Sequence, residues 1–142
     1  MNELSLAKAK SIIQGAFEEG EKLELQPLSV IVLDPGGHMI AFERQDGAAP
    51  GRYQIADGKA NAALMLGMPS SKLMARAEQQ AYFVDALNGA YGGRIIPVPG
   101  GVLIKNAAGK TLGAVGVTGD TSDNDAAAAS AGIASAGFEF EA

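Results

Sequence analysis

The fold of this chain is set by one stretch, Leu28-Ser29-Val30-Ile31-Val32-Leu33-Asp34-Pro35-Gly36-Gly37-His38-Met39-Ile40-Ala41-Phe42-Glu43. It begins with a β-branched, apolar run that is typical of a buried strand. The four residues 34–37 then favour a tight turn, so 38–43 return as the second strand of a β-hairpin. Alternation of side chains along that second strand predicts His38, Ile40 and Phe42 on one face.

Helices are predicted on both sides of this hairpin. Apolar residues at helical spacing indicate a helix over about 4–19, and an alanine-rich segment indicates another over about 53–66. Ser70 and Ser71 are expected to cap one or two short helices that extend to about Asn88. A last helix is expected over about 124–136.

Three more strands are predicted after the helical half, at Arg94–Val98, Val102–Asn106 and Thr111–Val117. The element order is therefore α-β-β-α-α-β-β-β-α. Because the links between consecutive strands are short, the strands should pair antiparallel. We expect one α+β domain over residues 1–142, with a five-stranded antiparallel sheet and flanking helices.

Composition excludes several classes of partner. The chain has 142 residues, a net charge of -5 and no basic cluster, so neither nucleic acid nor an anionic membrane is an expected partner. It has no cysteine, which excludes disulfides, thiolate nucleophiles and sites with cysteine ligands. The start, Met1-Asn2-Glu3, lacks the features of a signal peptide, and no stretch reaches the roughly 20 apolar residues that span a bilayer. These features predict a cytoplasmic protein.

His38 is the only histidine of the chain. In a chain without cysteine it is the first candidate for ligation of a transition metal or of haem iron. The alternative is a turn histidine whose side chain is hydrogen-bonded to the backbone. Spacing alone does not separate the two hypotheses.

Lys59 is the second notable residue, because on the helix predicted over 53–66 it lines up with Ile55 and Ala63 on an otherwise apolar face. A lysine there requires a partner. Glu43 or Asp46 would make it a structural salt bridge, whereas a free ammonium would bind an anion or take part in catalysis.

Two arginines, Arg44 and Arg52, bracket the loop before this helix. Together with Lys59 they can receive carboxylates such as the propionates of haem. The alternative is that both are ordinary surface arginines.

Two other stretches favour structural roles. Gly113-Ala114-Val115-Gly116-Val117-Thr118-Gly119 resembles a dinucleotide-binding loop, but such a unit needs a further parallel strand with an acidic residue after the next helix, and only about ten residues follow that helix. Its glycines are better explained by close packing of a helix on the sheet. Asp120-Thr121-Ser122-Asp123-Asn124-Asp125 has calcium-like spacing without the glycine and distal glutamate of an EF-hand loop. Capping of a helix by Ser122 or Asp123 explains it better.

Taken together, four blocks resemble the signature of the GlcG/HbpS-like haem-binding proteins, some of which degrade haem. The blocks are residues 32–48 around Gly36-Gly37-His38, Ile55-Ala56-Asp57-Gly58-Lys59-Ala60, residues 97–104 around Pro99-Gly100-Gly101, and residues 112–125. The resemblance spans nearly the whole chain. The resemblance implies a profilin-like fold, assembly into homo-oligomers, and kinship with the C-terminal domains of PduO-type corrinoid adenosyltransferases. Related genes also occur in glycolate-utilisation operons.

The resemblance also implies haem as cofactor, with His38 as the axial ligand of the iron. Arg44, Asp46 and Lys59 match other family positions, with a role in either the site or the fold. Ala126 stands where many relatives carry a glutamate, which puts a role for an acid there in doubt. With one histidine per chain, a sixth ligand would be water, a methionine, a residue of a neighbouring chain, or a tyrosine such as Tyr53 or Tyr91.

Three functions follow as hypotheses. The first is a homo-oligomeric protein that binds haem through His38, senses it or degrades it, and has Arg44, Arg52 or Lys59 near the propionates. The second is an enzyme or sensor for a small organic carboxylate that is held by Lys59 and Arg44, with His38 or Asp46 as proton carrier. The third is a structural or regulatory oligomer without a ligand.

Overall fold

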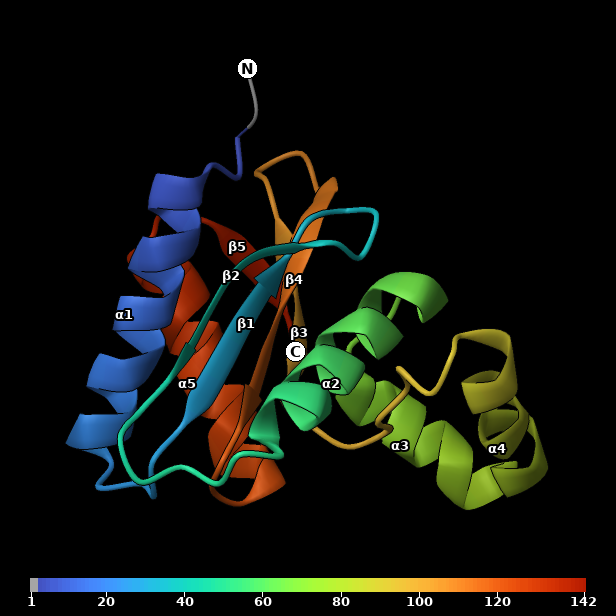
Figure 1. Ribbon diagram of the computed structural model, residues 1–142. Coiled ribbons are helices and arrows are strands. Elements are labelled where there is room, and N and C mark those ends of the chain that lie inside the picture. The colour runs from blue at the N-terminus through green and yellow to red at the C-terminus, as the bar shows by residue number, and fades with distance from the viewer. Residues whose placement is uncertain (1–2) are drawn as a thin grey trace.

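The computed structural model describes residues 3–142 as an α+β fold around one five-stranded antiparallel sheet (Figure 1), which confirms the predicted fold class. Strand order in the sheet is β2-β1-β4-β3-β5. The elements, in chain order, are α1 (Leu6–Lys22), β1 (Ser29–Leu33), β2 (Met39–Arg44), α2 (Arg52–Leu66), α3 (Ser70–Gln79), α4 (Ala81–Ala90), β3 (Gly101–Lys105), β4 (Thr111–Thr118), α5 (Ser122–Ser135) and β5 (Glu139–Glu141).

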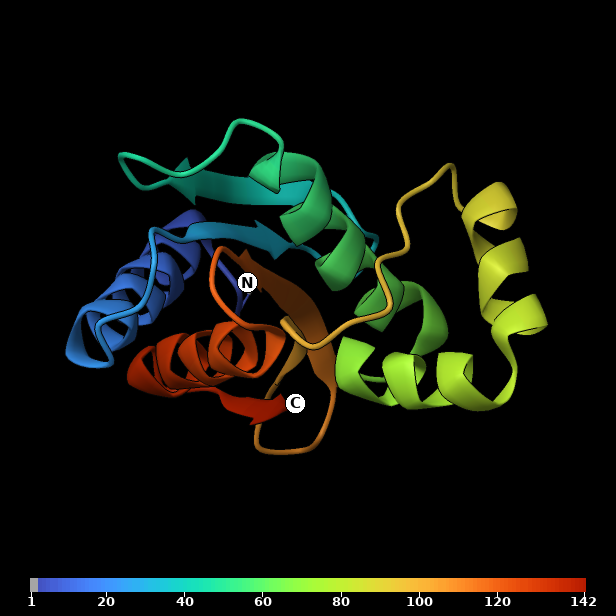
Figure 2. The same cartoon turned by 90° about the horizontal axis from the view of Figure 1, so that it is seen from below.

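Helices cover both faces of the sheet. α1 and α5 lie together on one face, and α2 lies on the other, with α3 and α4 packed beyond it (Figure 2). Side chains of β1, β3 and β4 alternate between the two faces, so Val115 and Val117 join the core under α1 and α5, whereas Ile31 and Ala114 join the core under α2. No helix within residues 3–142 combines the length and the apolar character needed to cross a membrane.

One predicted strand is wrong. Residues 94–98 form no strand, and the fifth strand is β5, at the far end of the chain. Pro97 has no backbone N–H to give to a sheet, and the Ile96 amide donates instead to the carbonyl of Gly58 in α2, at 3.2 Å. Ile95 is fully buried among residues of α2, α3 and α4. The segment therefore runs along α2 and covers its far side.

Two predicted helix caps are also wrong. The residue before α3 is Pro69, and the Ser70 hydroxyl is buried and accepts a hydrogen bond from the Gly101 amide at 2.7 Å. α5 is capped by Thr121, whose hydroxyl accepts from the Asn124 amide, and not by Ser122 or Asp123. In both cases the predicted polar residue does lie near the start of the helix. The Ser70 hydroxyl, however, bonds to strand β3, and at α5 the neighbouring Thr121 is the cap.

The hairpin forms as predicted, with a β-bulge that changes its faces. The pairing of β1 with β2 shifts between Val32 and Leu33, so that Leu33 lies opposite Met39 while Ile31 lies opposite Phe42. Met39 and Phe42 therefore face α2, and Ile40 packs against the core on the opposite face. The predicted alternation, with Ile40 and Phe42 on one face, is wrong because it assumed a regular strand.

α2 sits unusually close to the sheet, because two glycines face it. A Cβ atom on Gly116 would lie 2.0 Å from the carbonyl oxygen of Ala56, and one on Gly101 would lie 2.1 Å from that of Lys59. Both glycines are paired directly across β3 and β4. The prediction that glycines of the 113–119 stretch allow close packing of a helix on the sheet is confirmed.

We predict that Gly116→Ala lowers the free energy of unfolding by about 1–3 kcal/mol or more, since the new methyl group displaces α2 from the sheet. Chemical denaturation with circular dichroism measures the loss. Gly89→Ala is the matched control: a Cβ there has nothing within 4 Å, and alanine favours the helix α4, so stability should rise by about 0.5–1 kcal/mol. Equal behaviour of the two variants would show that the close approach of α2 does not constrain the fold.

Candidate functional site

The turn between β1 and β2 holds His38 in a defined position. Asp34 Oδ1 accepts hydrogen bonds from the amides of Gly36 (2.9 Å) and His38 (3.0 Å), and the Asp34 amide donates to the His38 carbonyl at 2.8 Å. The bond from the His38 amide is the main reason that the pKa of Asp34 lies below its usual value. Gly37 has a φ of +85°, which glycine adopts without strain.

The imidazole of His38 points away from the protein, with 82% of the side chain exposed. Its Nδ1 lies 3.4 Å from Asp34 Oδ1, so its partner is a carboxylate and not the backbone, which is the partner that the alternative hypothesis expected. Within residues 3–142 no hydrogen bond involves Nε2. Histidines that bind a metal commonly give their other ring nitrogen to a carboxylate, and Nε2 of His38 is left for such a role.

An arginine that the sequence analysis missed lies beside this turn. Arg94 donates from Nε and Nη2 to both carboxylate oxygens of Asp57 (2.7 and 2.9 Å), and Nη2 also donates to the Gly37 carbonyl at 2.9 Å. The hydrogen bond with Asp57 raises the pKa of Arg94 above its usual value. Asn61 completes the cluster, because its amide nitrogen donates to the Arg94 carbonyl at 3.1 Å. In the sequence, the signal that could have pointed to this cluster is the i, i+4 spacing of Asp57 and Asn61, which places both side chains on one face of the helix.

Apolar side chains lie along the face of β2 that α2 covers, starting with the residue after His38. Met39 is 55% exposed, and the ring of Phe42 packs edge to face on that of Tyr53 in α2, with centroids 5.1 Å apart. Tyr53 is itself 38% exposed. We call His38, Met39, Phe42, Tyr53 and Arg94 the His38 surface.

The predicted arginines lie at the opposite end of β2, where the chain leaves the sheet for α2 (Figure 1). Arg44 pairs with Ser29 across the hairpin, and Arg52 donates from Nη1 to the Thr118 hydroxyl at 2.8 Å. Six residues of extended strand separate His38 from Arg44, a distance of about 20 Å. The structure thus brings Arg44 and Arg52 to one end and places His38 at the other.

Lys59 is buried inside the protein and has two internal partners. Its Nζ lies 3.0 Å from the Val117 carbonyl and 3.1 Å from Asp125 Oδ2, with both side chains 2% exposed. Burial lowers the pKa of Lys59 below its usual value, although the Asp125 carboxylate opposes this shift. The prediction that Lys59 requires a partner is confirmed, but the partner is Asp125 and not Glu43 or Asp46.

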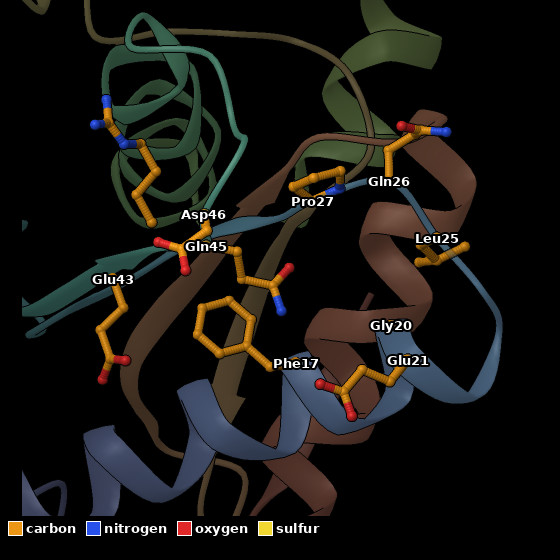
Figure 3. Close-up of a pocket in the computed structure, with 10 residues that line it drawn as sticks. Phe17, Gly20, Glu21, Leu25, Gln26, Pro27, Glu43, Gln45 and Asp46 are labelled. Carbon is orange, nitrogen blue, oxygen red and sulfur yellow. The ribbon is translucent and has the colours of Figure 1, made fainter.

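One cavity of about 500 Å³ opens between the C-terminal half of α1, residues 25–27 and the end of β2 (Figure 3). Phe17 lies opposite Gln45 in it, and Glu43 and Asp46 lie on the β2 side. It does not include His38. Within the described part of the chain, no group of three or more histidine and acidic side chains is arranged to hold a bare metal ion.

Comparison with known proteins gives this arrangement its context. Residues 4–134 match the sequence pattern of the family described as "Haem degrading protein HbpS-like". A double mutant of HbpS from Streptomyces reticuli is 32% identical, covers 92% of this chain and 85% of its own, and has a TM-score of 0.79.

Two more distant structures share the fold. A PduOC:haem complex is 21% identical with a TM-score of 0.85, and covers 98% of this chain and 99% of its own. The Klebsiella pneumoniae protein ORFY is 23% identical with a TM-score of 0.82, and covers 93% of this chain and 89% of its own. No curated protein sequence matches the chain.

We predict that Lys59→Met lowers the free energy of unfolding by about 3–5 kcal/mol, because the buried carboxylate of Asp125 loses its counter-charge. Equilibrium denaturation at neutral pH measures this loss. Lys72→Met is the control, since Lys72 pairs with Glu141 at 3.1 Å but its side chain is 63% exposed, and the expected loss is below about 1 kcal/mol. Similar small losses in the two variants would contradict a structural role for Lys59.

Proposed function

This chain belongs to the HbpS-like family of haem-degrading proteins, and from that membership we propose that it binds haem, or a similar planar tetrapyrrole, at the His38 surface. His38 is the axial ligand of the iron in this proposal. The observation that carries it is the exposed imidazole, whose Nδ1 lies 3.4 Å from Asp34 Oδ1 while Nε2 makes no hydrogen bond within residues 3–142. A neutral imidazole nitrogen is a common axial ligand of haem iron.

The rest of the His38 surface suits the other parts of a haem. Met39, Phe42 and Tyr53 offer apolar contact to the flat face of the ring. Arg94 donates hydrogen bonds from Nε and Nη2 to Asp57 and Gly37, and within residues 3–142 no hydrogen bond involves its Nη1. That nitrogen can donate to a propionate.

Arg94 replaces the predicted cations in this role. Arg44 lies about 20 Å of strand away from His38, farther than the propionates of a haem extend from its iron. Arg52 lies at the same end as Arg44 and donates to Thr118. Lys59 is buried and held by Asp125 and Val117. Asp46 lies beyond Arg44 at the same distant end.

We further propose that the protein self-associates around the ligand. A haem on His38 has this chain against one face only, because the side chains of the His38 surface lie open in a single copy. A second copy would cover the other face of the ring and supply the sixth ligand, unless water does so. Degradation of the bound haem is tested by adding a reductant in air and following loss of the haem absorbance.

We predict that the purified apoprotein shows a saturable Soret shift with micromolar haem and that His38→Ala reduces the affinity at least tenfold or changes the spectrum. Absorbance titration measures both. Imidazole added to the His38→Ala complex should restore the original band, because it supplies the missing ligand. Tyr82→Ala is the control for adsorption of haem to exposed aromatic rings, since Tyr82 is 74% exposed on α4, away from the site.

A flat titration of the wild type would contradict haem binding. An unchanged spectrum and affinity in His38→Ala would show that haem binds elsewhere. In the first case, self-association measured without ligand supports a structural role.

We also predict that Arg94→Gln weakens haem affinity about tenfold while the Soret maximum stays where it is, because a lost propionate contact leaves the axial ligand unchanged. The same titration measures this. Arg76→Gln serves as the charge-matched control, because Arg76 contacts Gln80 and Phe83 within the α3–α4 pair. A shifted Soret band in Arg94→Gln would indicate that the variant disturbs the turn of His38 instead.

A further inference from the structure

We propose a second ligand site, for the carboxylate group of a small organic acid, where β2 ends and α2 begins. It consists of Ser29, Arg44, Arg52 and Thr118, which we call the arginine end. It is separate from the His38 surface and does not depend on haem binding. It also differs from the predicted carboxylate site, because Lys59 is not available for it.

The sheet register brings three of these residues into one row. Ser29 of β1 lies opposite Arg44 of β2 on one side and opposite Thr118 of β4 on the other. Directly paired residues point to the same face, with Cβ atoms about 4.5–5.5 Å apart. The face is the one that α2 covers, because Ile31, two residues after Ser29, packs against that helix. α2 begins above this row with Arg52, which reaches down to Thr118 at 2.8 Å.

Neither guanidinium group of Arg44 and Arg52 has a carboxylate partner among the described residues. Within residues 3–142 no carboxylate lies within 4 Å of either arginine, although Asp46 follows two residues after Arg44. Arg44 is exposed and Arg52 is half-buried. The nearby Lys59 is already matched by Asp125, and the charge of Arg52 acts on Lys59 as a repulsion that lowers its pKa further. A bound carboxylate would relieve this repulsion.

The hydroxyl of Ser29 supplies the independent sign of a missing ligand. Ser29 is completely buried, and its Oγ has no hydrogen-bond partner among the described residues. Buried hydroxyls almost always have a partner, because an unpaired one has lost its hydrogen bonds to water without replacing them. Thr118 accepts from Arg52, so its own O–H is also free to donate.

These groups together form a donor set for one carboxylate. Two guanidiniums provide paired N–H donors at the rim, and two hydroxyls provide O–H donors beneath them. A carboxylate entering past the exposed Arg44 would satisfy Ser29 and bridge the two arginines.

The test is calorimetric titration of the full chain with acetate, glycolate and malonate at matched ionic strength, together with thermal unfolding in each acid. We expect saturable binding that weakens about tenfold in Arg44→Gln and in Ser29→Ala. Lys110→Gln is the charge-matched control, since Lys110 is exposed on the β3–β4 turn, and should bind like the wild type. His38→Ala should also bind like the wild type.

Ser29→Ala separates a site from a merely structural residue. Removing an unpaired buried hydroxyl should leave the unfolding temperature of the free protein unchanged or raise it, while the stabilisation by carboxylate falls. Absence of binding in the wild type, or equal binding in every variant, would overturn the proposal. So would a loss of haem affinity in Arg44→Gln as large as that in His38→Ala, because the arginines would then serve a haem propionate. Failure of haem binding alone would leave these results unaffected.

Discussion

The close approach of α2 to the sheet is the constraint on which both ends of the molecule depend. Gly101 and Gly116 leave room for the backbone of α2 at Lys59 and Ala56. These contacts fix the distance of the helix from the sheet and its rotation about its own axis. Each turn of α2 then meets a defined partner. Its first residue reaches Thr118, its second packs on Phe42, and Asp57 holds Arg94 against the turn of His38. A helix held farther away by larger residues would lose all three contacts together.

The buried pair of Lys59 and Asp125 adds specificity to this arrangement. Lys59 extends from α2 past Gly100, where a Cβ would lie 2.9 Å from its Nζ, and meets Asp125 in α5 on the far side of the sheet end. Removing two charges from water costs much of what their attraction returns, so such a pair stabilises little compared with well-packed apolar residues. It does penalise every other placement of α2 and α5, because either charge would then be buried alone. Asp125 also accepts the Asp120 amide at 2.9 Å, which ties the start of α5 to the end of β4.

The sequence was sufficient where the deciding interactions are local. The hairpin turn depends on the bonds of Asp34 Oδ1 to the amides of Gly36 and His38, at most four residues away, and on the positive φ of Gly37. It was predicted correctly. Lys59 was correctly marked as needing a partner, but Asp125 lies 66 positions away and no local pattern identifies it. The extended run at 94–98 looks like a strand by composition, and only its packing along α2 shows that it pairs with no other strand. Arg94 and Ser29 were missed for the same reason, because their importance comes from long-range neighbours.

Around His38, the polar groups without an internal hydrogen bond define which ligand can bind. The amides of the turn, both oxygens of Asp57 and two nitrogens of Arg94 are all engaged in internal hydrogen bonds. These bonds hold the turn rigid before any ligand arrives, so little conformational entropy would be lost on binding. Nε2 of His38 and Nη1 of Arg94 make no hydrogen bond within residues 3–142, and the exposed apolar side chains of Met39 and Tyr53 lie on β2 and α2. A ligand that matches them carries a metal ion that accepts the lone pair of the imidazole nitrogen, a flat apolar body and an anionic edge. That combination of requirements favours a metallated tetrapyrrole with carboxylate side chains over a small anion, which would use only the arginine.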